Sequence, residues 1–347
     1  MENITFNPND AAVANGNYFG MPYLIEQAPI VIVSVPWDVT TSYRPGTARA
    51  PWAIINASSQ LDFFDFDVQD AWKIGIGTFP VDLEIEALNN KMRPIAEGVI
   101  AHLEKGGDPI LVEREVEAVN EASIILNQKV YASTLELINQ GKLIGLVGGE
   151  HSVPLGFIQA LTTRHQDFGI LHIDAHADLR KAYEGFTFSH ASIMYNVMKL
   201  KEVTKLVQVG VRDECDDEVN LATTSERIVQ YDDYLLAEAE FEGKPWGKQC
   251  MEIISKLPES VYVSFDIDGL SPEFCPNTGT PVPGGLSFQK AVYLLRKIVD
   301  SGRRIIGFDV SEVAPGKDEW DASVGARIIY KLCNLMYISN KGIKANR

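Results

Sequence analysis

The sequence predicts an α/β fold, a three-layer α/β/α sandwich with a mostly parallel central sheet. Short apolar runs alternate with longer amphipathic segments along most of the 347 residues. Continuous apolar runs of this kind are typical of strands buried on both faces of a parallel sheet, and the segments between them are long enough for crossover helices. The chain has no linker rich in proline and serine, low-complexity tract or internal repeat, so we expect a single domain over residues 1–347.

The expected strands are the apolar runs at residues 30–35, 143–147, 169–173, 206–211, 261–265 and 304–310. The expected helices are the segments with apolar residues at helical spacing, at residues 154–164, 191–200, 246–256, 287–301 and 322–335. Repeated units of strand and helix place helices on both faces of the sheet, because each crossover packs back onto the strands that it connects.

Residues 81–140 depart from this alternation, because nearly the whole segment has a helical pattern. Breaks are expected at Pro94, which has no N–H to donate, and around the glycine- and proline-containing turn at residues 106–109. We therefore expect a helical insertion at about 81–140 that forms two or three helices beside the sheet and is not a separate domain.

The composition limits the partners. With 31 basic and 47 acidic residues the formal charge is −16, which disfavours nucleic acid and anionic membranes and is compatible with a cationic substrate or simply with solubility. The four cysteines form no Cys-x-x-Cys pair, the first ten residues do not resemble a signal peptide, and no apolar run approaches the roughly 20 residues that cross a bilayer. We expect a cytoplasmic protein.

Carboxylates and imidazoles follow the predicted strands where each strand ends, and the carboxyl ends of parallel strands meet at one edge of a sheet. Carboxylates suit hard cations and imidazoles suit transition metals, so the mixed set indicates a metal between these extremes. Six ligands are too many for one ion with an open position but fit two ions that share carboxylates, although loop capping with a structural ion is the alternative. The candidate ligands are His151, Asp174, His176, Asp178, Asp266 and Asp268.

Three segments resemble the signature motifs of the ureohydrolase family, which includes arginases and agmatinases. They are residues 148–152 (Gly-Gly-Glu-His-Ser), 174–178 (Asp-Ala-His-Ala-Asp) and 264–270 (Ser-Phe-Asp-Ile-Asp-Gly-Leu), with a further likeness at residues 35–47. The resemblance implies an arginase-like fold and two Mn²⁺ ions per chain. By this resemblance, His151, Asp174, Asp178 and Asp266 hold the first ion, and Asp174, His176, Asp266 and Asp268 hold the second.

The sequence departs from the family pattern at Glu150, where the family usually has Asp. This side chain is expected to support its neighbours without touching a metal. An additional methylene group can shift the orientation of adjacent ligands, so Ni²⁺ or another divalent ion remains open.

Two further residues match the family's functional positions. Glu312 matches the carboxylate that pairs with the guanidinium of the substrate, and helix capping is the alternative interpretation of this residue. His190 resembles the histidine that passes a proton to the leaving amine, for which an imidazole pKa near 6.5 is suitable. We expect a structural role for Asp309, and we expect His172 to be a hydrogen-bonded core residue. The loop at residues 279–286 is expected to line the site.

The resemblance is closest to the agmatinase branch. Arginases typically carry Asn where this chain has Arg180, and Asp where it has Cys215, and both contacts help to hold the amino-acid head of arginine. The expected reaction is therefore the hydrolysis of agmatine to putrescine and urea. The first alternative is another guanidino substrate (guanidinobutyrate, arginine or guanidine), since Arg180 could attract a carboxylate. A second alternative is a metal-binding homologue without turnover. The resemblance also implies a homo-oligomer, a trimer or hexamer.

Overall fold

The computed structural model describes residues 6–11 and 13–346 and contains an eight-stranded sheet in which every strand pairing is parallel. The strand order is β2-β1-β3-β8-β7-β4-β5-β6. The strands are β1 (Ile30–Ser34), β2 (Ile76–Thr78), β3 (Leu143–Val147), β4 (Phe168–Ile173), β5 (Val203–Val209), β6 (Ile228–Tyr231), β7 (Ser260–Asp266) and β8 (Arg304–Ser311).

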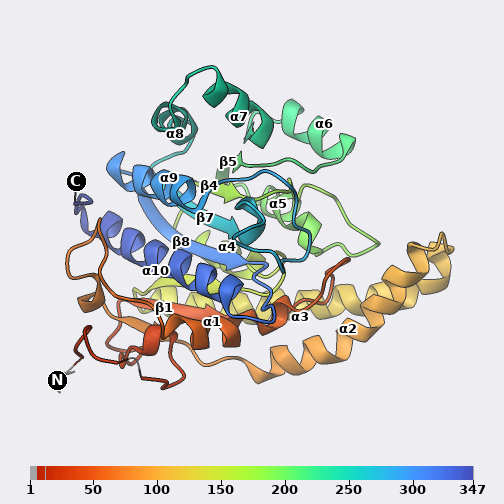
Figure 1. The fold of residues 1–347 in the computed structure, drawn as a ribbon. Coiled ribbons are helices and arrows are strands. Elements are labelled where there is room, and N and C mark those ends of the chain that lie inside the picture. The colour runs from red at the N-terminus through yellow and green to blue at the C-terminus, as the bar shows by residue number, and fades with distance from the viewer. Residues whose placement is uncertain (1–5, 12, 347) are drawn as a thin grey trace.

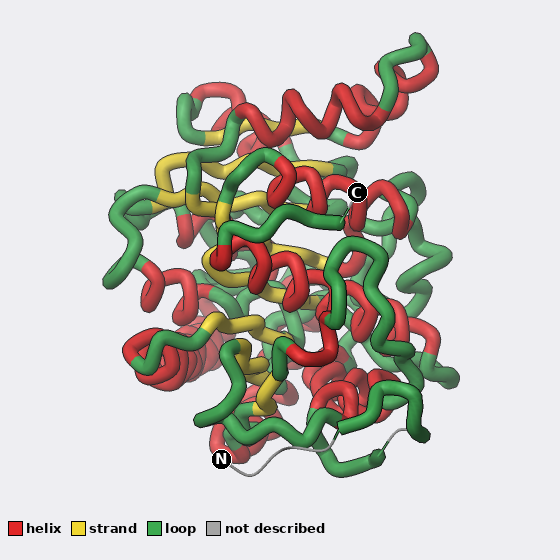
Figure 2. Tube along the Cα trace, turned by 90° about the vertical axis from the view of Figure 1, so that its left-hand side faces the viewer, coloured by secondary structure: helices red, strands yellow, loops and turns green. Residues whose placement is uncertain are grey.

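Helices cover both faces of this sheet, as the sequence predicts (Figures 1 and 2). The α-helices are α1 (Ala50–Ser58), α2 (Leu83–Leu103), α3 (Glu113–Asn139), α4 (Leu155–Leu161), α5 (Ile193–Val197), α6 (Asp216–Thr224), α7 (Asp233–Phe241), α8 (Trp246–Ser255), α9 (Phe288–Asp300) and α10 (Trp320–Lys341). Short 3-10 segments are η1 (Tyr18–Gly20), η2 (Thr47–Arg49), η3 (Ala71–Lys73), η4 (Pro109–Val112), η5 (His190–Ser192) and η6 (Ile267–Gly269). Among the described residues no helix is both long enough and apolar enough to cross a membrane.

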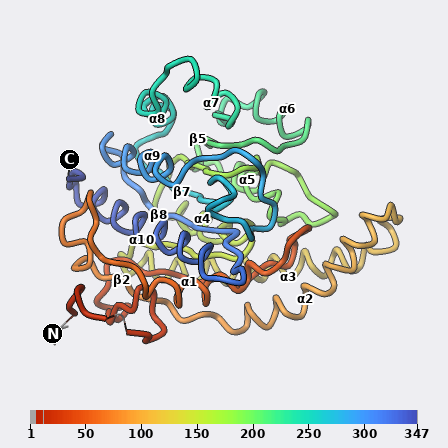
Figure 3. Tube along the Cα trace, in the orientation of Figure 1, coloured from red at the N-terminus to blue at the C-terminus, as the bar shows by residue number. Residues whose placement is uncertain are grey.

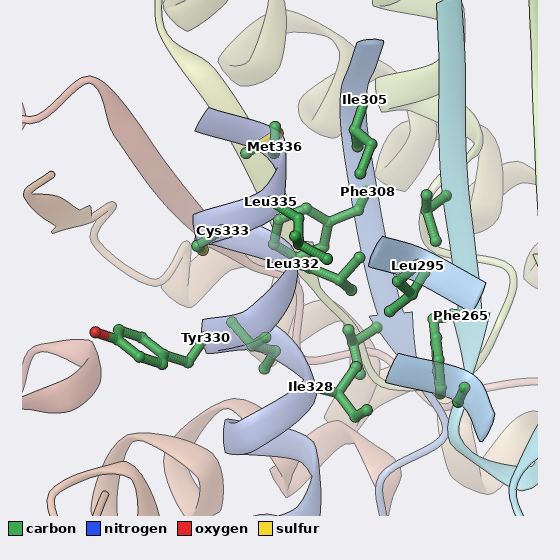
Figure 4. Packing of buried hydrophobic residues seen from close by; sticks show 14 of the residues in the cluster. Phe265, Leu295, Ile305, Phe308, Ile328, Tyr330, Leu332, Cys333, Leu335 and Met336 are labelled. Carbon is green, nitrogen blue, oxygen red and sulfur yellow. The ribbon is translucent and has the colours of Figure 1, made fainter. Parts of the chain in front are cut away.

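Two apolar clusters separate the layers. On one face α1, α8, α9 and α10 pack against the sheet, and on the other face α2, α3, α4 and α5 do so. Figure 4 shows part of the first cluster, in which Leu332 and Leu335 of α10 lie beside Phe308 of β8. The three-layer prediction is confirmed, with the sheet entirely parallel.

The helical insertion consists of two long helices, α2 and α3, which run side by side and extend beyond the body of the molecule (Figure 3). The break expected at residues 106–109 is present, but the break expected at Pro94 is wrong, because α2 runs through this residue. Pro94 and Asn90 are exposed, so water can reach the carbonyl group that the proline leaves without a donor. Met92 and Ala96, on either side, are buried and hold both halves of the helix against the core.

The strand prediction missed β2 and β6, the two strands at the edges of the sheet. Each is three or four residues long, which is too short for a periodic pattern to stand out. The helix prediction missed α1, α6 and α7, each of nine residues.

Candidate metal centre

The predicted ligands lie together at the carboxyl ends of β3, β7 and β4, and Glu312 follows β8, which lies between β3 and β7 in the sheet. The pairings of Val147 and Phe265 with Val310 bring these strand ends to one level of the sheet. Five of the ligands line a cavity of about 180 Å³, and the sixth, Asp174, is completely buried beside it. The lining ligands are His151, His176, Asp178, Asp266 and Asp268.

Asp174 connects two groups of ligands, one through each of its oxygen atoms. Its Oδ2 lies 2.9 Å from Nδ1 of His151, and its Oδ1 lies 3.4 Å from Nδ1 of His176. Around His151 Nδ1, the Oδ2 atoms of Asp178 and Asp266 lie at 3.1 and 3.3 Å, whereas His176 Nδ1 has Asp268 Oδ2 at 3.1 Å. This arrangement fits two ions that share a carboxylate.

The charge of the site also fits bound cations. Burial raises the pKa of Asp266 well above its ordinary value, and the carboxylates of Asp268 and Asp174 raise it further. Burial, followed by the charge of Asp174, raises the pKa of Asp178 to about 6. Carboxylates crowded together in a buried site need compensating positive charge, and divalent ions supply it.

His172 also contacts Asp174, but its hydrogen bonds give it a supporting position. Gln208 Nε2 lies 2.9 Å from His172 Nδ1 and 2.7 Å from the carbonyl oxygen of Ala177, so this amide donates to both. The other ring nitrogen, Nε2, therefore carries a proton and donates to Asp174 Oδ2 at 2.8 Å. His172 holds Asp174 in place, in agreement with its prediction as a hydrogen-bonded core residue.

The backbone around the site is strained. Asp178 and Glu312 have φ angles of 54° and 62°, in the left-handed region that side chains other than glycine rarely adopt. Gly149 allows the closest approach, because a Cβ atom at this position would lie 1.9 Å from the carbonyl oxygen of Trp37. Its own carbonyl oxygen accepts the N–H of Glu312 at 2.8 Å, which connects the end of β3 to the turn after β8.

Glu312 extends one free carboxylate oxygen toward the cavity that it lines. Its Oε1 accepts the backbone N–H of His151 at 2.9 Å, whereas Oε2 is buried and makes no hydrogen bond among the described residues. Burial raises the pKa of Glu312 well above its ordinary value, and the nearby Glu150 adds to the shift. A free buried carboxylate oxygen of this kind is a ready acceptor for a cationic N–H donor.

His190 lies at the start of η5 and lines the same cavity. Burial lowers its pKa to about 3, and the positive charges of His176, His151 and Arg93 contribute. The sequence leads us to expect an ordinary imidazole pKa near 6.5 at His190, whereas burial in the structure moves the pKa far below that value. His190 is neutral at physiological pH, and a neutral imidazole accepts a proton before it can give one away.

Arg180 also lines the cavity, but its charge is already paired. Its Nε lies 3.5 Å from Glu218 Oε2, and its guanidinium lies over the ring of Tyr183, 4.9 Å from the centroid. Glu218 is buried and also accepts the N–H groups of Leu179 and Cys215. Asp213 and Glu214 also line the cavity, so its lining has more negative than positive charge.

Several residues that hold the site were not singled out from the sequence. Gln208 orients His172, and Ser264 Oγ lies 2.9 Å from Nε2 of His151, which leaves Nδ1 of that ring for a metal. Arg212 donates to the carbonyl oxygens of Asp268, at 2.7 Å, and of Val282, at 3.0 Å, and so ties η6 to the loop at residues 279–286. From that loop Thr280 lines the cavity, as expected. Of these residues, Ser264 belongs to a motif already compared with the family.

Comparisons with known proteins agree with this geometry. The arginase family model matches residues 28–334. An N(1)-aminopropylagmatine ureohydrolase from Thermus thermophilus is 31% identical over 324 residues, which cover 93% of each chain. An agmatinase from Cronobacter sakazakii is 30% identical over 320 residues, covering 92% of this chain and 89% of the relative.

Solved structures show the same fold. The agmatine ureohydrolase of Thermoplasma volcanium superposes with a TM-score of 0.70 at 20% identity, over 94% of this chain and 96% of that one. The sequence matches extend over nearly the whole chain and include all three ligand motifs. The chain therefore belongs to the arginase family, as a ureohydrolase that acts on C–N bonds of amidines.

Proposed function

We propose that this protein hydrolyses agmatine to putrescine and urea with two Mn²⁺ ions per chain. The observation that carries the proposal is that one cavity is lined both by the candidate metal ligands, whose two groups Asp174 joins, and by Glu312, whose Oε2 is free. A guanidinium in this cavity would have its carbon near the nucleophile while Glu312 holds its N–H groups.

The ligands for the first ion are His151, Asp174, Asp178 and Asp266, and those for the second are Asp174, His176, Asp266 and Asp268. When bound, the two ions lower the pKa of a shared water and so make a strong nucleophile available near neutral pH. The hard carboxylate oxygens and two imidazoles suit Mn²⁺, and Ni²⁺ is the first alternative.

Glu312 binds and orients the substrate. Its Oε2 accepts an N–H of the guanidinium, while its Oε1 stays on the backbone N–H of His151, at 2.9 Å. The carboxylate therefore places the substrate relative to the same loop that carries a metal ligand.

His190 moves the proton. Hydrolysis of a guanidinium cation to urea and an ammonium ion moves both protons of one water to the leaving nitrogen. The neutral imidazole takes the first proton and delivers it to that nitrogen as the C–N bond breaks. The second proton comes from the hydroxyl group on the carbon as the carbonyl group of urea forms, and the amine is released as the ammonium ion.

The wall around Arg180 supports a substrate with a cationic tail. Because Glu218 and Tyr183 already engage the guanidinium of Arg180, this residue is poorly placed to hold the carboxylate of guanidinobutyrate or arginine. Asp213 and Glu214 instead offer carboxylates to an ammonium group. A longer amine, as in N(1)-aminopropylagmatine, is the second candidate, because Asp213 is exposed at this wall and could meet a tail that extends outward.

Urea release tests the proposal. We expect the protein loaded with Mn²⁺ to release urea from agmatine or N(1)-aminopropylagmatine faster than from arginine, guanidinobutyrate or guanidine, with the same ranking after loading with Ni²⁺. Absence of urea from all five compounds, with two ions bound per chain, would contradict the function.

Three further properties are proposed, the oligomeric state from the family resemblance and the other two from the composition. We expect a trimer or hexamer in solution, a small guanidino compound as the partner in place of nucleic acid or membrane, and a cytoplasmic location. The four cysteines are unpaired in the structure, which is compatible with a reducing compartment.

A further inference from the structure

Glu150 is a buried carboxylate surrounded by hydrogen-bond donors. Its Oε2 accepts the backbone N–H of Thr40 at 2.7 Å, and its Oε1 accepts the hydroxyl groups of Thr40, at 2.8 Å, and Ser152, at 2.6 Å. The hydroxyl of Thr41 is a weaker fourth donor, 3.4 Å from Oε2. Each of these four contacts comes from an N–H or hydroxyl group that can donate, so the carboxylate of Glu150 is the acceptor in all of them.

Thr40 transmits this arrangement to His190. A threonine hydroxyl has one proton, and at Thr40 that proton points to Glu150. The oxygen can then only accept from its other neighbours. It accepts the backbone N–H of His190 at 3.1 Å and lies 3.3 Å from Nδ1 of the same residue.

We propose that the Glu150–Thr40 pair fixes the tautomer of His190, with the proton on Nδ1 and the lone pair on Nε2. Nδ1 donates to Thr40 Oγ1, and Ser189 Oγ, 3.2 Å away, serves as a second acceptor on the same side. Nε2, on the opposite side of the ring, is then able to take up the proton of the water. The catalytic part of this inference rests on the proposed function, whereas the tautomer itself does not.

The helical insertion holds both partners of this contact. Arg93 of α2 donates to the carbonyl oxygens of Asp38, Val39 and Thr41, the residues on either side of Thr40. Asn120 of α3 donates to the carbonyl oxygen of Gly185 at 3.1 Å and accepts the N–H of Thr187 at 2.8 Å, within the loop that leads to His190. Residues 81–140 therefore brace the two loops that meet at Thr40 and His190.

The tautomer is testable by ¹⁵N NMR of histidine-labelled protein loaded with Mg²⁺, in which the His190 signals are identified by their absence from His190→Ala. We expect a protonated Nδ1 and an unprotonated Nε2 in the parent protein and in Thr40→Ser. An unprotonated Nδ1 in the parent protein overturns the proposal.

Glu150→Gln gives a sharper form of the same test. The fixed backbone N–H of Thr40 requires the amide oxygen of Gln at the Oε2 position, which places the NH₂ group against the Thr40 hydroxyl. The hydroxyl then accepts from Gln and donates to His190, so the proton of the imidazole moves to Nε2. An unchanged tautomer in a folded Glu150→Gln protein that binds two ions counts against the proposal.

A double-mutant cycle tests the catalytic consequence. We expect Thr40→Val to lower kcat about 10- to 100-fold with little change in KM, and Thr40→Ser to restore most of it. In a His190→Ala background, Thr40→Val should cost almost nothing further, because Thr40 acts through the imidazole. An equal loss of kcat in both backgrounds contradicts this role.

Thr47→Val is the matched control, since Thr47 is also buried and its hydroxyl makes no hydrogen bond among the described residues. Its kcat should equal that of the parent protein, and a loss as large as that of Thr40→Val would show that the substitution acts through the fold. The two proposals fail separately, because NMR requires no turnover. A missing urea product rejects the proposed function and leaves the tautomer result unaffected.

Discussion

Strand β8 contributes to two regions that differ in almost every physical respect. Along the strand before Asp309, Ile305 and Phe308 are buried with side chains of α10 in an apolar core (Figure 4). At its carboxyl end, the chain passes through Asp309 and Ser311 to Glu312, all buried and polar.

The two regions differ in whether the chain itself supplies partners for the buried groups. In the core, neighbouring side chains of the same chain fill the space. At the edge, Glu312 has a positive φ angle, and one of its oxygens makes no hydrogen bond among the described residues. Strain and unpaired buried groups cost free energy of folding, so the second region is organised for a ligand and the first for stability. Substitutions at the polar edge should therefore change activity and metal binding, whereas substitutions in the apolar core should change stability.

The largest expected effect is that of Asp174→Asn. Asp174 connects the two ligand groups, so the amide should weaken binding of both ions and lower kcat about 10³-fold or more. Metal content per chain and urea release measure the two effects. Asp217→Asn on the exposed side of α6 is the control and should bind two ions. Two tightly bound ions in Asp174→Asn would contradict the shared-ligand assignment.

Phe308→Ala should lower stability and leave metal binding unchanged. Phe308 is completely buried, and its ring fills the space over Gly145, where a Cβ atom would lie 2.2 Å from it. Removing the ring leaves a cavity that should lower the free energy of unfolding by about 3–5 kcal/mol. Denaturant unfolding measures this loss. In the folded fraction, the metal content should match that of the parent protein, and a lost ion would mean that the two ends of β8 are coupled.

This contrast explains how far the sequence could predict the molecule. The strands at the centre of the sheet were predictable, and so was the gathering of the candidate ligands at one edge of it, because buried strands leave continuous apolar runs and their carboxyl ends meet at one edge. The short edge strands and the uninterrupted helix at Pro94 depend on packing and on exposure to water, which local patterns do not reveal.

The same limit applies within the site. His151 and Asp174 belong to recognisable motifs, but the contact of Thr40 with Glu150 joins residues 110 positions apart. The pKa of His190 falls to about 3 because of burial and nearby cations, and neither is visible in the residues beside it. A motif shows which groups are present, whereas their protonation depends on which distant groups the fold brings near.

Glu312→Gln should separate activity from stability. Loss of a charge-assisted contact to the guanidinium should lower kcat/KM roughly 10- to 100-fold. The free energy of unfolding should rise slightly, because the amide replaces a buried carboxylate whose charge is disfavoured by burial. Urea release and denaturant unfolding check the two effects, with the exposed Glu242→Gln as the control. A clear loss of stability would place Glu312 with the structural residues.

The smallest expected effect lies outside both regions, on the exposed face of α2. Gly98 is inside this helix, and a Cβ atom added there would meet no other atom within 4 Å. Alanine restricts the unfolded chain more than glycine does, so Gly98→Ala should raise the free energy of unfolding by about 0.5–1 kcal/mol. Gly156→Ala, in α4, is the comparison and should lower the free energy of unfolding. Its Cβ atom would lie 2.3 Å from the backbone oxygen of Asn127, so α3 would have to move. If α2 acts only as a brace for the loop at Thr40, then Gly98→Ala should leave kcat unchanged, and a changed kcat would show that the motion of the helix itself contributes to turnover.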